Sequence, residues 1–377
     1  MDNTDPGPSA DLRPRELTAL DRLLLALVER GGSDLHLSEG SPPILRIHGR
    51  LEPLPFPDLP AAALRVILNE VLKTPVQRER FGLENDIDFS YEASGVGRFR
   101  GNAFLQNRGL SVVLRVVPGT PPSADDLGLP ATVRGFTELH RGMVLITGPA
   151  GVGKSTTLAA LIDLINETRA DHVITIEDPI EFIHLNKKAL VNQREVGVHT
   201  RSFATALRAA LREDPDVILV GEMRDPETIS IGLTAAETGH LVLGTMHTTS
   251  AHKTIDRIID SFPGDQQGQV RSMLAESLQA VVSQQLIPTK DGKGRVMALE
   301  IMLNTSAIGN LIREGRTFQI PSAIQSAGRK TGMVLMDQSI TELLEAGLIS
   351  TEDARMYMND TRNLDEGVLA GRYPAHS

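Results

Sequence analysis

A glycine-rich stretch carries the clearest chemistry in the chain. Residues 148–157 read Gly-Pro-Ala-Gly-Val-Gly-Lys-Ser-Thr-Thr, which fits the phosphate-binding pattern G-x-x-x-x-G-K-[ST]. Glycines let the backbone amides curl around a phosphate, and a helix N-terminus adds roughly half a positive charge. Lys154 would reach the β- and γ-phosphates, and the Ser155 hydroxyl would bind Mg²⁺. The stretch therefore predicts that the chain binds a nucleoside triphosphate.

The segments on either side of this loop predict its place in a fold. Residues 143–147 form a short apolar run that is typical of a buried strand. From Thr156 to Thr168 the apolar residues recur at helical spacing. The loop is therefore expected between a strand and a helix, as its chemistry requires. The predicted nucleotide contacts come from nine consecutive residues: Gly148, Pro149, Ala150, Gly151, Val152, Gly153, Lys154, Ser155 and Thr156.

Carboxylates follow two further predicted strands. One strand ends before Glu177, Asp178 and Glu181, and the other is followed by Glu222. The carboxyl ends of parallel strands meet at the edge of a sheet where ligands bind. We therefore expect these acids to share coordination of Mg²⁺ and polarisation of the attacking water. The predicted metal ligands are Ser155, Glu177, Asp178 and Glu222, and the predicted catalytic acids are Glu177, Glu181 and Glu222. The alternative is that the acids cap helices or solvate strand ends.

One histidine and two arginines complete the candidate site. His247 follows an apolar strand and precedes two threonines, a position suited to sensing the γ-phosphate. Phosphoryl transfer commonly gains ~10³–10⁵ in rate from an arginine, but the loop contains none. Arg100 and Arg115 alternate with apolar neighbours on two predicted strands, so we expect them to project from the same face of a sheet. They are the candidate catalytic arginines, with surface solvation as the alternative.

Composition and charge restrict the class of protein. The chain has 377 residues, a net charge of −10 and no cysteine, which excludes disulfides and thiolate metal sites. The acidic balance argues against a general nucleic-acid binder, because phosphate contacts need a basic surface. The apolar runs are shorter than the ~20 residues that span a bilayer, and the N-terminus lacks the pattern of a signal peptide. We therefore expect no transmembrane segment and a cytoplasmic location.

The order of predicted elements gives an α/β fold in two domains. Strands and helices mix in the first domain, and they alternate in the second as in a parallel sheet. Near the end of the second domain we expect a long helix at residues 265–284, then a hairpin of strands at 285–288 and 295–302. The predicted boundaries are a disordered tail (1–16), an N-terminal α/β domain (17–117), a linker (118–126), an ATPase domain (127–360) and a frayed tail (361–377).

Four stretches, in this order, resemble the motif boxes of the secretion-superfamily ATPases. Walker A, Asp box, Walker B and His box correspond to residues 148–157, 174–181, 211–225 and 239–251. Within that superfamily the chain is similar to the motors that retract type IV pili. Further matches to these motors are Ser33-Asp-Leu-His-Leu37, Arg98-Phe-Arg100 and residues 106–109 and 307–314.

The resemblance implies an N-terminal PAS-like domain and a RecA-like P-loop ATPase domain with a helical C-terminal extension. It also implies a homo-hexamer in the cytoplasm, peripheral at the inner membrane against a pilus platform protein, with a paralogous motor as a further candidate partner. ATP would bind between the two domains, and Mg²⁺-dependent hydrolysis would drive pilin depolymerisation, pilus retraction and twitching motility. By position, Lys154, Ser155, Glu181, Glu222 and His247 fall on the catalytic boxes, and Arg100 and Arg115 on the first-domain arginines.

Gly309 departs from the retraction motif, which is usually read A-I-R-N-L-I-R-E, because it replaces the first arginine. Two rivals from the same superfamily are an accessory (PilU-like) retraction ATPase and a pilus-extension or type II secretion ATPase. The latter usually carries a four-cysteine zinc module, for which this chain has no cysteine. A DNA-translocating RecA-like motor is disfavoured by the acidic charge. A GTPase is disfavoured because Asn186-Lys187 lacks the following Asp of a guanine-reading motif.

Overall fold

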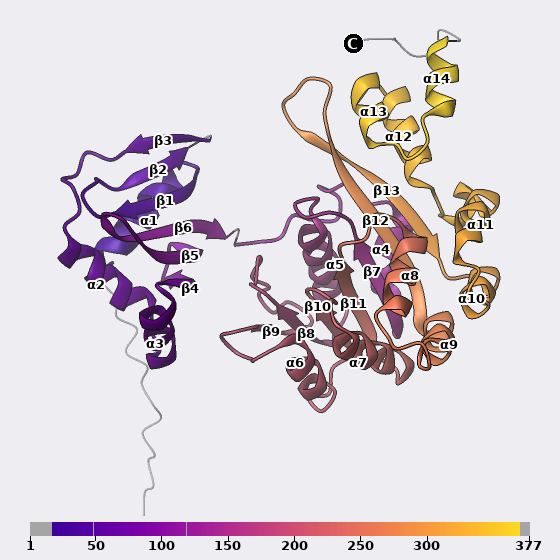
Figure 1. The fold of residues 1–377 in the computed structure, drawn as a ribbon, viewed down its shortest axis with the longest axis horizontal. Helices are drawn as coiled ribbons and strands as arrows, with labels where there is room; N and C mark the ends of the chain where they lie inside the picture. The colour runs from indigo at the N-terminus through magenta and orange to yellow at the C-terminus, as the bar shows by residue number, and fades with distance from the viewer. Residues whose placement is uncertain (1–16, 48, 118, 370–377) are drawn as a thin grey trace, which may run out of the picture. The chain divides into compact units, whose positions relative to one another are not determined.

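The computed structural model describes residues 17–47, 49–117 and 119–369 of the chain. The chain divides into two compact units between Gly119 and Thr120, and each unit has its own sheet and its own core (Figure 1). The predicted disordered tail (residues 1–16) and the last part of the predicted frayed tail (370–377) lie outside the described residues. None of the helices in the described ranges is long and apolar enough to cross a bilayer.

The first unit is built on an antiparallel sheet in the order β3-β2-β1-β6-β5-β4. Its strands are β1 (Gly32–Ser38), β2 (Ile44–Ile47), β3 (Arg50–Pro53), β4 (Asp86–Ala93), β5 (Gly97–Gln106) and β6 (Gly109–Val117), and its helices are α1 (Ala19–Glu29), α2 (Ala61–Val71) and α3 (Pro75–Glu84). Alternate strand residues join the apolar faces of α1 and α2 in one core. The sequence does not predict α3, because none of its residues is buried and an apolar period is therefore missing.

The second unit is built on a sheet in the order β13-β12-β7-β11-β10-β8-β9, in which only β13 runs antiparallel to its neighbour. Its strands are β7 (Gly142–Thr147), β8 (His172–Glu177), β9 (Leu190–Glu195), β10 (Val217–Val220), β11 (Leu241–Met246), β12 (Leu278–Pro288) and β13 (Arg295–Leu303). Met143 and Leu145 of β7 enter one apolar cluster, and Val144 and Ile146 enter a second. Both faces of the sheet are therefore covered, as expected for parallel strands.

The helices of the second unit are α4 (Ala131–Arg134), α5 (Lys154–Thr168), α6 (Phe203–Ala210), α7 (Pro226–Glu237), α8 (Ala251–Asp260), α9 (Gln267–Ser277), α10 (Ser306–Arg313), α11 (Ile320–Ala327), α12 (Met336–Glu345), α13 (Thr351–Tyr357) and α14 (Arg362–Leu369). They cover the sheet and form the C-terminal part of the unit (Figure 1). The fold class is thus the predicted one, an α/β chain with an ATPase-type parallel sheet.

Two sequence predictions in this unit are wrong. The long helix at 265–284 ends at Ser277, and the chain continues as β12 beside β7. An apolar run containing Val281 and Val282 suits a buried strand as well as a helix, so the pattern alone does not separate them. The frayed end predicted from Thr361 contains α14, because Leu364 is buried in the C-terminal core and Asp365 pairs with Arg355 at 2.7 Å.

Candidate nucleotide site

The glycine-rich loop joins β7 to α5, and α5 begins at Lys154. Gly153 is the N-cap residue with φ +83°, and no side chain caps the helix, so its first amides remain available to an anion. Gly148 has φ +143°, and a Cβ there would lie 2.4 Å from the Gln284 carbonyl oxygen. Glycine is therefore required at 148 by both its backbone and its neighbour.

Lys154, His247 and Glu222 form a connected polar chain at the carboxyl ends of the strands. The Lys154 ammonium donates to the Gly148 and Pro149 carbonyl oxygens, both at 2.8 Å, and lies 3.3 Å from His247 Nδ1. His247 Nε2 lies 2.8 Å from Glu222 Oε1. Arg224 pairs with the same carboxylate oxygen. The structure thus brings together Lys154, which the sequence predicts for nucleotide binding, and two predicted catalytic residues, Glu222 and His247.

The partners of His247 favour one tautomer of the neutral ring. Lys154 offers only donors, so Nδ1 faces it as an acceptor, whereas the Glu222 carboxylate accepts and Nε2 must donate. A neutral imidazole with its proton on Nε2 satisfies both contacts. Among the described residues, the hydrogen bond and the ion pairs of Glu222 all use Oε1, which leaves Oε2 for water.

Burial changes the acid–base properties of two site residues. It lowers the pKa of Lys154, and the negative charges of Glu222 and Glu181 act in the opposite direction. It raises the pKa of Glu177, against hydrogen bonds from the Thr175 hydroxyl and the Gln193 amide. Oε1 of Glu177 accepts both of these bonds, at 2.6 and 3.1 Å, and the Glu181 backbone amide also donates to this carboxylate, so Glu177 has little capacity left for a metal ion.

A cavity of about 940 Å³ lies over the loop and is lined entirely by residues of the second unit. Its walls contain most of the predicted nucleotide and metal residues: Ala150, Gly151, Val152, Gly153, Lys154, Ser155, Thr156, Glu177, Asp178, Glu181, Glu222 and His247. Gly148 and Pro149 instead contribute the carbonyl oxygens that hold Lys154. No three His, Asp or Glu side chains within the described ranges cluster tightly enough to hold a metal ion alone. Proteins usually hold Mg²⁺ through one or two carboxylates together with substrate phosphates, so a nucleotide-bound Mg²⁺ does not require a cluster of three protein ligands.

Gln284 of β12 holds the loop from the side of the sheet, and the sequence does not predict it. It is 1% exposed, its Oε1 accepts from the Thr157 hydroxyl at 3.0 Å, and its Nε2 donates to the Val152 carbonyl. One carboxamide therefore ties the loop to the first turn of α5. The sequence pattern predicts one helix at 265–284, and that prediction gives no reason to place Gln284 beside the loop.

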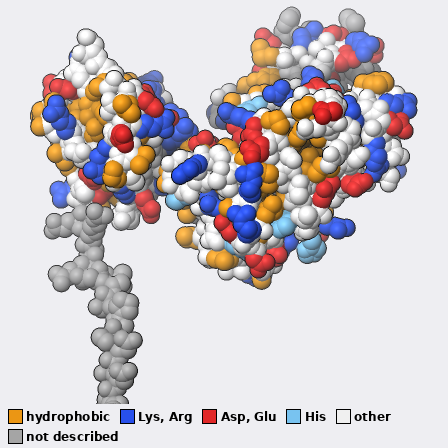
Figure 2. Space-filling model, turned by 60° about the horizontal axis from the view of Figure 1, so that its bottom comes forward, with side chains coloured by type: hydrophobic (Ala, Val, Ile, Leu, Met, Phe, Trp, Pro, Cys, Tyr) orange, Lys and Arg blue, Asp and Glu red, His pale blue; other side chains and the backbone are white. Residues whose placement is uncertain are grey.

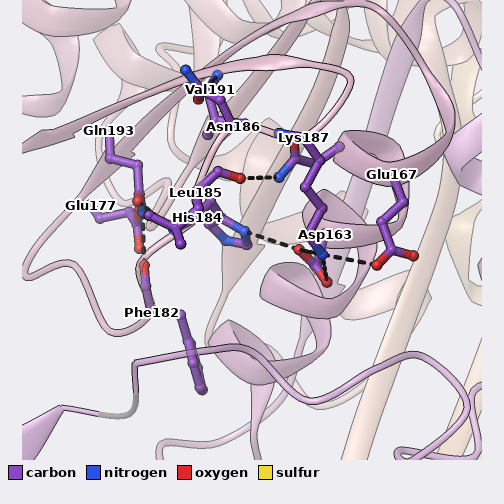
Figure 3. Close-up of polar contacts among 11 residues, drawn as sticks. Asp163, Glu167, Glu177, Phe182, His184, Leu185, Asn186, Lys187, Val191 and Gln193 are labelled. Carbon is purple, nitrogen blue, oxygen red and sulfur yellow. Dashed lines mark hydrogen bonds and ion pairs between the residues drawn. The ribbon is translucent and has the colours of Figure 1, made fainter.

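A second network fixes the segment that follows Glu181, as Figure 3 shows. Gln193 of β9 donates to Glu177 Oε1 and to the Phe182 carbonyl, and its own oxygen accepts from the His184 amide at 2.9 Å. Burial lowers the pKa of His184 to about 4, so this cavity-lining imidazole is neutral at pH 7. The side chain of Gln193 thus holds both Glu177 and the segment 182–184.

The same segment is tied to α5, the helix that begins with Lys154. Lys187 bridges Asp163 and Glu167 of α5 with contacts of 2.8 and 2.8 Å (Figure 3). Asn186 Oδ1 accepts from the Val191 amide. The Asn-Lys pair that resembles half of a guanine-reading motif is therefore used to hold its own segment, which further disfavours a GTPase.

Asn166, which is 0% exposed, should be a strong stability determinant of the second unit. Its carboxamide donates to the Leu185 carbonyl at 2.7 Å and accepts from the Lys187 amide at 2.9 Å. Asn166→Ala leaves both groups without their partner and should lower the free energy of unfolding in urea by about 1–3 kcal/mol. Asn192→Ala, at an exposed position where the amide contacts His172 Nε2 at 2.8 Å, is the control and should cost less than Asn166→Ala, because water can replace an exposed partner. Equal losses in both variants would contradict this role.

Arg100 and Arg115 belong to the first unit, where they are directly opposed on β5 and β6. The expectation that they share a sheet face is correct, since directly paired residues of an antiparallel sheet point to the same side. Arg115 Nε contacts Asp34 Oδ1 at 2.7 Å, a partner that the sequence does not predict.

Comparison with known proteins places the chain in a family. The model of the type II/IV secretion system protein family matches residues 19–360. The chain is 52% identical over 336 residues to the type IV pilus retraction ATPase PilT of Pseudomonas aeruginosa, covering 89% of this chain and 97% of the relative. It is 40% identical over 344 residues to the type IV pilus ATPase PilU of the same organism, covering 91% and 90%.

A solved structure agrees with this placement. The crystal structure of the pilus retraction motor PilT with bound ADP matches with a TM-score of 0.85 and 46% sequence identity, covering 93% of this chain and 99% of that one. The nucleotide-binding loop, the parallel sheet and these similarities lead to one assignment. The chain belongs to the type II/IV secretion system protein family and is a PilT-like ATPase.

Proposed function

We propose that this chain is an ATP-driven motor that powers type IV pilus retraction and twitching motility. It acts as a homo-hexamer in the cytoplasm, peripheral at the inner membrane through a pilus platform protein. The 52% identity to PilT over nearly the whole relative carries this proposal, and the lower identity to PilU (40%) favours it over an accessory role.

In the proposed reaction, Lys154 and the first amides of α5 bind the β- and γ-phosphates of ATP. Glu222 orients the attacking water through its free oxygen and accepts the proton that the water loses. His247 holds Glu222 by its Nε2–H and connects it to Lys154, so the acid is aligned with the phosphate-binding group. Glu181 adds negative charge near Lys154. Arg100 and Arg115 donate to phosphate oxygens and stabilise the charge of the transition state.

A magnesium ion would be held by Ser155 together with the phosphates of ATP, and it would neutralise charge on the transferred phosphoryl group. Asp178, Glu177 and Glu222 are the remaining candidate ligands. Of the two box acids, Asp178 is exposed, whereas Glu177 has one oxygen already engaged. Asp178 is therefore the better placed of the two to approach a hydrated ion.

Gly309, the departure from the retraction motif, has a local explanation. It is buried on α10, and a Cβ there would lie 3.3 Å from the Ala275 carbonyl at the end of α9. That distance is tighter than most side chains adopt, so an arginine would need α10 to move by a few tenths of an ångström. Arg313, the second arginine of the motif, is retained and half of its side chain is solvent-accessible. The departure therefore accompanies a close approach of two helices and leaves the second charge in place.

The test combines deletion of the gene with complementation by Lys154→Ala. Deletion should leave abundant surface pili without twitching motility, and the variant should not restore motility. The purified variant should lose Mg²⁺-dependent phosphate release, because an ammonium that binds two phosphates has been removed. Lys290→Ala, at an exposed position, is the control and should restore motility. Loss of pili on deletion would contradict retraction and favour a pilus-extension motor.

A further inference from the structure

A row of charged residues crosses the sheet of the first unit. Reading across the strands, Ser90, Arg100, Arg115, Asp34 and Arg46 are successive direct partners on β4, β5, β6, β1 and β2. Directly paired residues lie on one face of a sheet, so the three guanidinium groups share that face. Figure 2 shows several Lys and Arg side chains, with Asp and Glu side chains between them, on the visible face of this unit.

The row contains more positive than negative side chains. Three arginines face one carboxylate, which leaves two positive charges in excess. Arg46 is committed within the unit, because its Nε lies 3.8 Å from Asp34 and its Nη1 donates to the Gly49 carbonyl at 2.9 Å. The Arg100 side chain is exposed and makes no hydrogen bond or ion pair with the described residues. Like charges placed directly opposite destabilise a sheet, so the pair of Arg100 and Arg115 suits an anionic ligand.

Asp34 controls how Arg115 is presented. The Asp34 side chain is 4% exposed, whereas that of Arg115 is 71% exposed. The contact of 2.7 Å uses Arg115 Nε, so both terminal nitrogens are left to donate outward. Burial alone would raise the pKa of Asp34, but hydrogen bonds from Ser33 and Arg115 outweigh it and the pKa is lowered. A buried, ionised carboxylate therefore anchors an exposed guanidinium by its inner nitrogen.

We propose that Asp34 is a positioning residue for ATP hydrolysis, which fixes Arg115 so that its two terminal nitrogens form a preorganised pair of phosphate donors. The inference rests on the proposed role of Arg100 and Arg115 at the phosphates. A planar, bidentate donor matches phosphate geometry, and fixing it beforehand lowers the entropy lost when it binds. Asp34 lies in the Ser33–Leu37 stretch, to which the retraction function otherwise assigns no task.

The test is a double-mutant cycle on the full-length ATPase, with Asp34→Asn, Arg115→Ala and the pair. Asp34→Asn should lower kcat by on the order of 10- to 100-fold, because a misplaced catalytic group has an effect of that size, with the affinity for ADP unchanged. In the Arg115→Ala background, Asp34→Asn should have no further effect on kcat. Arg46→Ala, which removes the other partner of Asp34, is the control and should keep the wild-type kcat.

Arg115→Lys provides a second test if Asp34→Asn does not fold. The lysine keeps the charge at an exposed position, but its single ammonium pairs with Asp34 and presents no fork. Its kcat should fall as far as that of Arg115→Ala, and a wild-type kcat would overturn the positioning role of Asp34. An equal effect of Asp34→Asn with and without Arg115 would also overturn it. A wild-type kcat for Arg115→Ala would instead refute the proposed arginine site, and this inference with it.

Discussion

Replacing Glu222 by glutamine should lower the kcat of ATP hydrolysis by ~10²–10⁴-fold and leave nucleotide affinity nearly unchanged. Glutamine keeps the size of the side chain and an oxygen for His247 Nε2, which lies 2.8 Å from Glu222 Oε1. It cannot take a proton from water, and it carries no charge to polarise that water. Lys154 and the amides of α5, which bind phosphate, are left intact. Steady-state phosphate release and binding of a fluorescent ADP analogue measure the two quantities separately.

Glu227→Gln is the matched control for this change. Glu227 is an exposed acid in the first turn of α7 that pairs with Arg208, and it does not line the cavity. The control should hydrolyse ATP at the wild-type rate. If Glu222→Gln also retained the wild-type rate, Glu222 would not be the residue that activates water. A loss of ADP binding in Glu222→Gln would show that the acid supports the loop rather than the chemistry.

The loop and its polar chain are predictable because their motifs coincide with strand ends. Lys154, Glu222 and His247 each follow an apolar strand of a parallel sheet, and the carboxyl ends of such strands meet at one edge. Their sequence positions therefore imply proximity without any knowledge of side-chain packing. The observed chain from Lys154 through His247 to Glu222 agrees with that reasoning.

The residues that hold the loop are not predictable in this way. Gln284 contacts Thr157 and Val152 across more than a hundred residues of sequence, and the sequence pattern predicts a helix where the structure has strand β12. Asn166 is a buried polar residue of α5, and the apolar spacing that predicts this helix carries no information about it. The contacts of these two amide side chains depend on which helices and strands become neighbours in the fold. No sequence spacing around Gln284 or Asn166 indicates those neighbours.

Asp34 illustrates the same limit in the first unit. Alternation along β5 and β6 correctly predicts that Arg100 and Arg115 share a face, because the period of a strand is two. Their pairing with β1 depends on the order of strands in the sheet, in which β1 lies beside β6. The carboxylate that anchors Arg115 is 81 residues away in sequence and becomes visible only with that order.

Arg100→Ala should lower kcat by about 10³-fold while slightly raising the thermal stability of the first unit. Arginines that donate to the transferred phosphoryl group commonly contribute ~10³–10⁵ in rate. Arg100 stands directly opposite Arg115 and has no partner among the described residues, so its removal relieves a like-charge contact and breaks no bond. A variant that loses activity but gains stability indicates that the original residue is retained for function. Phosphate release and a thermal melt measure both effects on the same preparation.

Arg80→Ala separates this effect from a general loss of positive charge on the same unit. Arg80 is an exposed arginine of α3 that pairs with Glu84 at 2.9 Å, one helical turn away. Its removal should leave kcat unchanged and should not raise the melting temperature, because an attractive pair is lost instead of a repulsive one. Equal kcat in Arg100→Ala and wild type would exclude Arg100 from the phosphate site. A fall in both kcat and melting temperature would mean that Arg100 stabilises the fold, because removing a purely repulsive contact cannot lower the melting temperature.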